Sequence, residues 1–389
     1  MGKSKEMKKY IDISGFNIYQ ANRGNAALSY GSISFLEENK LLKPGQELIF
    51  FQYYRNPFKA KYLLPKRFRY LINGKSYYQN IVPIWFIEKN LCLKFKFFRT
   101  FFRYGRLLNN VAYEAADYGG DGFSDIYGEK LFYARLNQTL PFIKIGIPLY
   151  ILPQTIGPFK NKEIENIAHK VLCYAKEVYV RDDRYTQTLD AMGINYKKMK
   201  DLSAYMKPEP WDIDIERNSI GLNISGLTYS NNFRGLENQF ELYPALINHI
   251  IELFRSKGCT IYLIPHSYNC AKPENNNDDM VACKNVYEKL HNKANVIFVD
   301  KNLSSPQVKY LISKMSFFIG TRMHANFAAI YTNTPVFGLS YSYKFIGAFN
   351  ANGLNGAEQT ASINNMTKED IETVLSKIDK CYNKYVLNT

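Results

Sequence analysis

The stretch SFFIGTRMHANFAAI, residues 316–330, followed by the apolar run Pro335–Leu339, decides the fold expected for this chain. A short apolar strand ends at Gly320, a helical pattern rich in alanine follows, and a second apolar strand comes next. Alternation of this kind predicts an α/β sheet with parallel strands. Arg322 and His324 then lie at the end of the first strand, where open α/β sheets bind ligands.

These side chains suit an anionic substrate that needs a proton. Arg322 offers a planar fork of donors for a carboxylate or phosphate. His324 titrates near neutral pH and can deliver a proton. Tyr341 and Lys344 follow the next strand, and the small-residue helix brings its positive N-terminus close. The segment therefore predicts an anion site with an acid.

The same alternation runs through the chain twice, which predicts two Rossmann-like α/β domains facing a cleft. A length of 389 residues also suggests two domains. The Pro-rich segment Lys207–Trp211 breaks the rhythm, so we place the domains at 1–208 and 209–389. An amphipathic helix, Lys368–Tyr382, is expected to close the second domain.

Residues 53–110 fit neither rhythm, because large aromatic residues alternate there with cations. Residues 1–110 hold 20 Lys and Arg against six Asp and Glu, a net charge of +14 out of +15 for the whole chain. We interpret 53–110 as a basic aromatic insertion beside the first sheet. Two roles stay open: attachment to an anionic membrane surface, or an aromatic subdomain packed on the domain.

Composition argues against a metal-binding protein, a disulfide-bonded protein and an integral membrane protein. The six Cys form no CxxC pair and the five His are scattered, so we expect reduced thiols, no metal site and a cytoplasmic protein. Apolar runs stay short of the roughly 18 residues that a membrane span needs.

Four further turns place candidate ligand groups at strand ends. The segment 22–28 follows the first strand and opens a helix, with Gly24 permitting a tight turn and free N–H groups favouring an anion. The glycine-rich turn 117–125 offers acids that could act as a base or bind sugar hydroxyls, or could instead cap a helix. The other candidates at strand ends are Gln154, Thr155, Arg181 and His266.

Together these motifs resemble the polysaccharide pyruvyl transferase family over nearly the whole chain except about 53–110. The motifs, in order, are Asn22-Arg-Gly-Asn-Ala-Ala-Leu28, Gly119-Gly-Asp-Gly-Phe-Ser-Asp125, Gln154-Thr-Ile-Gly-Pro158 with Val180-Arg-Asp182, and Gly320-Thr-Arg-Met-His324 with Pro335, Tyr341 and Lys344. Two departures are Asn25, where the family usually carries an acid, and the Gly-Gly-Asp-Gly order in the second motif.

The resemblance implies a fold like the GT-B glycosyltransferases and transfer of pyruvate from phosphoenolpyruvate to a sugar as a cyclic ketal, in exopolysaccharide or capsule synthesis. It implies no cofactor beyond that donor. The expected catalytic residues are His324 as the acid and Asp121 or Asp125 as the base. The expected donor-binding residues are Arg322, Lys344, Arg181, His266 and Tyr341. The expected acceptor-binding residues are Asn22, Gly24, Asn25, Gly120, Gln154 and Thr155.

Two other functions stay possible from the sequence. One is a GT-B-type glycosyltransferase that uses a nucleotide sugar in the same kind of cleft. The other is a non-enzymatic basic adaptor that binds membrane or nucleic acid through 53–110. We expect no nucleic-acid partner, because the rest of the chain is balanced in charge. A lipid-linked acceptor on the inner face of the cell membrane would suit the basic segment.

Overall fold

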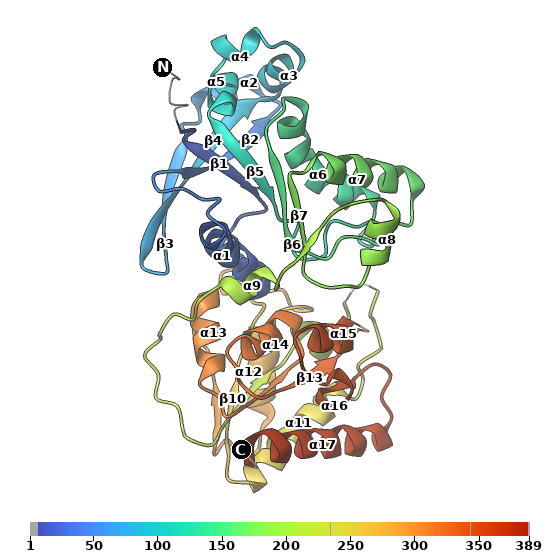
Figure 1. The fold of residues 1–389 in the computed structure, drawn as a ribbon. Helices are drawn as coiled ribbons and strands as arrows, with labels where there is room; N and C mark the ends of the chain where they lie inside the picture. Colours follow the sequence, from blue (N-terminus) through green and yellow to red (C-terminus); the bar gives the residue numbers. More distant parts are fainter. Residues whose placement is uncertain (1–6, 234, 343, 388–389) are drawn as a thin grey trace. The chain divides into compact units, whose positions relative to one another are not determined.

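The computed structural model describes residues 7–233, 235–342 and 344–387, without the side chains of 60–62 (Figure 1). The chain divides into two compact units. The first holds Met1–Phe16 and Leu28–Tyr205, and the second holds Asn17–Ala27 and Met206–Thr389. Grouping of residues 17–27 with the second unit differs from the sequence-based expectation, which places all of 1–208 in one domain.

The first unit is built on an eight-stranded sheet in the order β3-β4-β2-β1-β5-β6-β7-β8. Neighbouring strands are parallel except β3 and β4, which form an antiparallel hairpin. The strands are β1 (Tyr10–Ser14), β2 (Glu47–Tyr54), β3 (Lys66–Ile72), β4 (Lys75–Trp85), β5 (Val111–Ala116), β6 (Leu149–Gln154), β7 (Glu177–Val180) and β8 (Lys197–Lys198).

The helices between these strands follow in chain order. They are α1 (Arg23–Glu38), whose first residues group with the second unit, α2 (Pro57–Tyr62), α3 (Phe86–Lys94), α4 (Phe98–Phe101), α5 (Arg103–Asn109), α6 (Glu129–Lys144), α7 (Lys162–Tyr174), α8 (Thr186–Ala191) and α9 (Leu202–Tyr205).

The basic aromatic segment is part of the first unit's fold rather than an insertion beside its sheet. Its hairpin extends the sheet through parallel pairing of β4 with β2. Asn73 and Gly74 turn the hairpin with positive φ angles of 52° and 74°, which suits the right-handed twist of paired strands. Tyr104 and Leu108 of α5 are fully buried in one core cluster with Ile49 of β2. These contacts account for part of the aromatic content by packing.

The second unit has a six-stranded parallel sheet in the order β11-β10-β9-β12-β13-β14. Counted from β9, this is the 3-2-1-4-5-6 order of Rossmann folds, which reverses between β9 and β12. The strands are β9 (Ser219–Asn223), β10 (Thr260–Leu263), β11 (Val296–Phe298), β12 (Phe317–Gly320), β13 (Val336–Ser340) and β14 (Thr360–Ser362). The helices are α10 (Gly226–Ser230), α11 (Tyr243–Ser256), α12 (Asp279–Lys289), α13 (Ser305–Ser313), α14 (Met323–Ile330), α15 (Lys344–Ala351), α16 (Gly356–Gln359), α17 (Lys368–Tyr382) and the π-helix η1 (Asn383–Leu387).

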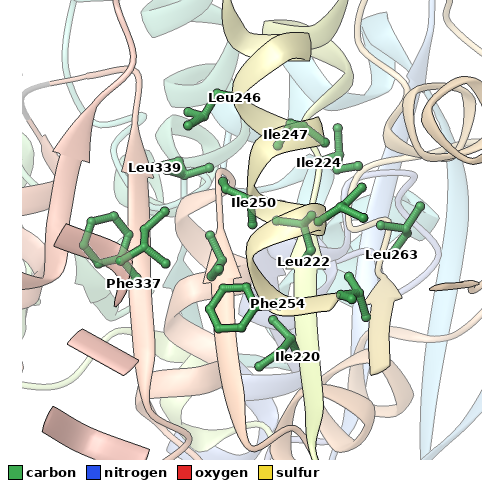
Figure 2. Close-up of a cluster of buried hydrophobic side chains, with 14 of the residues drawn as sticks. Ile220, Leu222, Ile224, Leu246, Ile247, Ile250, Phe254, Leu263, Phe337 and Leu339 are labelled. Atoms are coloured by element: carbon green, nitrogen blue, oxygen red, sulfur yellow. The ribbon is translucent and has the colours of Figure 1, made fainter. Parts of the chain in front are cut away.

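Alternation along the strands builds a core on each face of this sheet. Ile220 and Leu222 of β9 pack with Ile250 and Phe254 of α11, as Figure 2 shows. Phe318 of β12 points to the opposite face, where the cluster includes residues of α13 and α14. Because successive strand residues point to opposite faces, a continuous apolar run fills both layers. The predicted strand–helix–strand unit of residues 316–339 is therefore confirmed.

Candidate functional site

The strongest candidate site lies at the carboxyl ends of β9 and β12, where the strand order of the second unit reverses. Asn223 and Gly320 are register partners at these ends. The side chain of Asn223 accepts a hydrogen bond from the Arg322 amide (2.9 Å) and donates one to the Ile264 carbonyl (3.0 Å). This buried amide thus fixes the chain as it leaves three neighbouring strands, β9, β10 and β12.

Arg322 is held by a buried carboxylate. Its Nη2 donates to Asp279 Oδ1 at 2.7 Å and its Nε donates to the same oxygen at 3.0 Å. Nη2 also donates to the Asn277 carbonyl at 2.8 Å. Burial lowers the pKa of Arg322, but the Asp279 carboxylate and, to a smaller extent, Tyr341 and Tyr243 together raise it overall, so the guanidinium stays charged. The sequence-predicted cation is therefore partly neutralised and rigidly oriented.

Asp279 organises the site and was not predicted from the sequence. This fully buried residue begins α12, and its oxygens also accept the main-chain amides of Gly226 (2.9 Å), His266 (3.1 Å) and Ser267 (2.9 Å). The preceding Asp278 caps the helix through the Met280 amide (2.9 Å). The sequence does contain a signal for Asp279. One acid is enough to cap α12, yet two acids, Asp278 and Asp279, are adjacent at its start.

The His324 imidazole packs on the backbone of Gly24, from the segment 17–27. A Cβ atom added at Gly24 would lie 2.6 Å from Cγ and from Nδ1 of His324. Arg23 fastens this segment, since its Nε donates to the Leu303 carbonyl (2.8 Å) and its amide donates to the His266 carbonyl (3.0 Å). Its guanidinium also lies 4.1 Å from the centre of the Tyr268 ring. A side chain at position 24 would collide with the His324 ring, so the glycine predicted to permit a turn is required by this contact.

His266 lies in the same cluster, with only 4% of its surface exposed. Burial is the largest cause that holds its pKa well below 6.5, and the charges of His324, Arg322 and Arg23 lower the pKa further. His266 is therefore neutral at physiological pH. Its neutral ring adds no charge next to His324, which leaves a proton-donating role to the less buried histidine.

Two more predicted donor-side residues belong to this unit. Tyr341 follows β13, and its proximity contributes to the raised pKa of Arg322. Its ring also packs against Phe345, 5.8 Å between centroids. Lys344 is the first residue of α15, with an intermediate exposure. The structure thus brings Arg322, His324, His266 and Tyr341 into one unit together with Gly24.

Comparison with known sequences defines the relationship. The family model described as polysaccharide pyruvyl transferase matches residues 22–343, which is most of the chain. The chain belongs to the polysaccharide pyruvyl transferase family. The amylovoran biosynthesis protein AmsJ of Erwinia amylovora is 21% identical over 253 residues, covering 61% of this chain and 58% of AmsJ. The chain thus spans less than two thirds of that curated relative.

Solved structures show the fold of this family member. The putative UDP-N-acetylglucosamine 2-epimerase of Listeria monocytogenes has a TM-score of 0.56 at 11% identity, covering 98% of this chain and 91% of that chain. The UDP-GlcNAc 2-epimerase of Methanocaldococcus jannaschii has a TM-score of 0.55 at 10% identity, covering 98% and 93%. These likenesses confirm a GT-B-like fold of two Rossmann-like units.

The first unit holds six other predicted residues, at or just after the carboxyl ends of β5, β6 and β7: Gly120, Asp121, Asp125, Gln154, Thr155 and Arg181. Gly120 has a φ of +83°, and a Cβ there would lie 2.8 Å from Arg181 Nη1. Arg181 Nη1 donates to Asp201 at 2.6 Å and its Nε to the Thr155 hydroxyl at 3.0 Å. Burial lowers the pKa of Arg181, yet the nearby Asp201 and other acids raise it overall. These bonds hold Arg181 in this turn of the first unit.

Three of the residues predicted to contact substrate make hydrogen bonds within the protein: Gln154, Asp125 and Asn22. Gln154 is fully buried, and its amide donates to the Ala116 carbonyl (2.9 Å) and accepts from the Tyr118 amide (3.2 Å). Asp125 Oδ2 accepts the amides of residues 160 (2.6 Å) and 161 (2.8 Å). Asn22 Oδ1 accepts the Gly24 amide (2.9 Å), so it caps α1 and, with its neighbour Asn25, belongs to the second unit. These bonds hold Gln154, Asp125 and Asn22 in their own turns, while Oδ1 of Asp125 accepts no hydrogen bond from the described residues.

Asp121 is half-buried, as Asp125 is, but differs from it in its hydrogen-bond partners. Both of its oxygens accept from the Tyr127 hydroxyl at 3.0 Å.

Within the described ranges, no group of three or more His, Cys, Asp or Glu side chains has the geometry of a metal site. In those ranges no helix is long and apolar enough to cross a membrane.

Proposed function

We propose that this chain transfers pyruvate from phosphoenolpyruvate to two hydroxyls of a sugar in a polysaccharide repeat unit, forming a cyclic ketal. The observation that carries the proposal is the convergence of His324, Arg322 and the first turn of α14 at the carboxyl end of β12. Family membership supports the same reaction. Phosphoenolpyruvate combines a carboxylate and a phosphate with a double bond that must be protonated, which this set of groups suits.

The donor needs fixed positive charge, and the site supplies it in two forms. Within the residues that the structure describes, the hydrogen bonds of Arg322 use Nε and Nη2 but not Nη1, which leaves Nη1 for a ligand oxygen. Arg322 is also the N-cap of α14 without a side-chain cap bond, so main-chain amides of the first turn can receive an anion. Lys344 at the start of α15 is proposed as a further cation.

In the proposed reaction, a carbon atom of the donor gains a proton and the donor loses its phosphate group. His324 protonates C3 of the donor, and a first sugar hydroxyl adds to C2 while losing its proton to a base. The bond from C2 to the phosphate oxygen then breaks, the second hydroxyl closes the ketal on C2, and its proton passes to the departing phosphate. The proposed base is Asp121 or Asp125, which lie four residues apart in the turn after β5.

The experiment is phosphate release from phosphoenolpyruvate across a panel of nitrophenyl and lipid-linked hexosides. We expect release only when an acceptor sugar is present, with a pyruvate ketal as the product. His324→Ala should lower kcat by at least about 10²-fold, as loss of an acid–base group does. Near-normal turnover of that variant would remove His324 from the mechanism.

A nucleotide-sugar reaction is the second candidate, because one similar structure is described as an S. aureus MnaA–UDP co-structure. That structure has a TM-score of 0.50 at 12% identity, covering 98% of this chain and 91% of that chain. Titration with UDP and with phosphoenolpyruvate separates the candidates. Tight binding of UDP, with no release of phosphate from phosphoenolpyruvate, would favour the glycosyltransferase.

A lipid-linked acceptor and attachment to an anionic membrane form part of the proposal. Phe95, Phe97 and Phe101, in and beside α3 and α4, are 46%, 67% and 60% exposed. Lys94 directly precedes Phe95, Lys96 lies between Phe95 and Phe97, and both lysines are exposed as well. Aromatic rings settle at lipid headgroups, and each cation adds about 1 kcal/mol near an anionic surface.

Sedimentation with vesicles of phosphatidylcholine and phosphatidylserine tests the attachment. Binding should weaken in salt and in the double variant Phe97→Ser, Phe101→Ser, while an exposed change elsewhere, Ile297→Ser, should leave it intact. Absence of binding at low salt would refute this part and leave the reaction untouched.

A further inference from the structure

A pocket separate from the proposed donor site lies within the first unit, over β1 and β2 and beside α3 and α6. Its volume is about 490 Å³, within the range of small-molecule sites. Asp12 of β1 and Tyr53 of β2 line it, with Phe86 and Lys89 from α3. None of these residues belongs to the proposed donor site, which lies in the second unit.

One carboxyl group lines this pocket, and a second lies beside it in the sheet. Asp12 lines it, and Glu114 is its register partner on the neighbouring strand β5, so both side chains lie on the same face of the sheet. Glu114 is fully buried; Oε1 accepts from the Thr139 hydroxyl at 2.7 Å, whereas Oε2 has no hydrogen-bond partner among the described residues. Burial raises the pKa of Asp12 to about 8. Burial also raises the pKa of Glu114 well above its usual range, so at neutral pH both carboxyls are protonated and can donate as well as accept.

The walls add rings, amides and one cation. The Lys89 ammonium lies 4.3 Å from the centre of the Tyr53 ring, and the Tyr53 hydroxyl is 3.2 Å from that of Tyr104. The pocket opens past Asn137 and Gln138, two exposed amides on α6. Amides, a carboxyl and an ammonium together offer both donors and acceptors, as hydroxyl groups require.

Charge narrows the ligand class. The Lys89 ammonium is the one cation in this lining, and burial keeps the Asp12 carboxyl protonated at neutral pH, so the lining carries a single positive charge. A dianion such as phosphoenolpyruvate or a nucleotide diphosphate would find a single ammonium, whose pKa burial already lowers. A neutral polyol loses little on entering such a site, because its hydroxyls can bond in either direction while its apolar faces lie on rings.

We infer that this pocket binds a neutral hexose unit of the acceptor glycan. The assignment of this hexose to the acceptor glycan rests on the proposed function. Hexose binding to the pocket does not depend on catalysis. Phe86 and Lys89 belong to α3, which also leads into the exposed phenylalanines proposed to meet the membrane. A glycan carried on a membrane lipid would therefore be presented beside this pocket.

Saturation-transfer NMR with methyl glucoside, methyl galactoside and methyl mannoside tests the inference on the full chain. At least one hexoside should receive saturation from the protein. Ala134→Trp, at an exposed α6 position lining the pocket, should raise its Kd at least about tenfold by filling the space. Asn137→Ala, which removes only an exposed amide, should weaken binding severalfold. Ala191→Trp on exposed α8 is the matched control and should bind as the parent does.

The outcomes separate the two proposals. Hexoside binding that depends on Ala134 but coexists with no phosphate release would sustain the pocket and refute the pyruvyl transfer. Absence of saturation for all three hexosides, or binding unchanged in Ala134→Trp, would overturn the pocket assignment. Displacement of a bound hexoside by millimolar inorganic phosphate would also overturn it, because it would assign the pocket to anions.

Discussion

Replacement of Gly24 by alanine probes the contact between the segment 17–27 and His324. The added Cβ would lie 2.6 Å from two atoms of the imidazole. Carbon atoms in contact prefer about 3.5–4.0 Å, so the ring must move by about 1 Å. Gly24 is the second residue of α1, and its φ is not positive, so alanine fits the backbone. Helix propensity should even favour alanine by up to about 1 kcal/mol.

The magnitude follows from the displacement. A misplacement of about 1 Å at a reacting group costs about 10²-fold in rate, which corresponds to about 2.7 kcal/mol of barrier. We therefore expect kcat for phosphate release from phosphoenolpyruvate to fall about 10²-fold in Gly24→Ala. The free energy of unfolding in urea should change by less than about 1 kcal/mol.

A matched glycine supplies the control. A Cβ added at Gly347 in α15 would meet no atom within 4 Å, so Gly347→Ala should keep both stability and turnover. Normal kcat in Gly24→Ala would show that the position of His324 does not limit the reaction. Loss of stability in that variant equal to its loss of activity would show that the contact serves folding instead.

Three further predictions concern buried charges. Asp279→Asn should lower the free energy of unfolding by about 3–5 kcal/mol in urea, because the Arg322 guanidinium would stay buried without its carboxylate; a loss below about 1 kcal/mol would contradict that account. Arg322→Lys should raise KM for phosphoenolpyruvate at least about tenfold, since lysine lacks the fork that binds Asp279 and a ligand together; an unchanged KM would remove Arg322 from donor binding. Asp12 has a folded-state pKa of about 8, above its unfolded value near 3.9, so the folded state holds the extra proton between these values and stability should fall as pH rises from about 4 to 8. The slope contributed is at most about 1.4 kcal/mol per pH unit, and Asp12→Asn should remove it; an identical slope in that variant would contradict the shift.

Local patterns predicted much of the second unit. The run 316–330 has the pattern of a strand and helix from its apolar residues alone, and the structure has β12 and α14 there. Arg322 and His324 were found the same way, because a strand end in an α/β sheet is a ligand position whatever the rest of the chain does. The carboxylate partner of Arg322, Asp279, was missed, since an acid at the start of a helix ordinarily acts as a cap.

Long-range packing explains the other differences. Nothing in the periodicity of residues 17–27 indicates that they group with a unit that begins almost 180 residues later. The hairpin β3–β4 did carry a local signal, the Asn73-Gly74 turn, but alternating aromatic and basic residues resembled a surface segment. The local pattern also could not predict whether Arg181 pairs with Asp201 or binds a ligand, because either role places an arginine at the end of a strand.

The central claim is protonation and ketal formation from phosphoenolpyruvate in the His324 site. The most direct measurement is mass spectrometry of the glycan product after reaction in D₂O with phosphoenolpyruvate and an accepted sugar. The proton of His324 exchanges with solvent, so we predict a pyruvate ketal whose methyl group carries a single deuterium, with phosphate released in equal amount. A product without deuterium in the methyl group, or a glycan unchanged while phosphoenolpyruvate stays intact, would contradict the account.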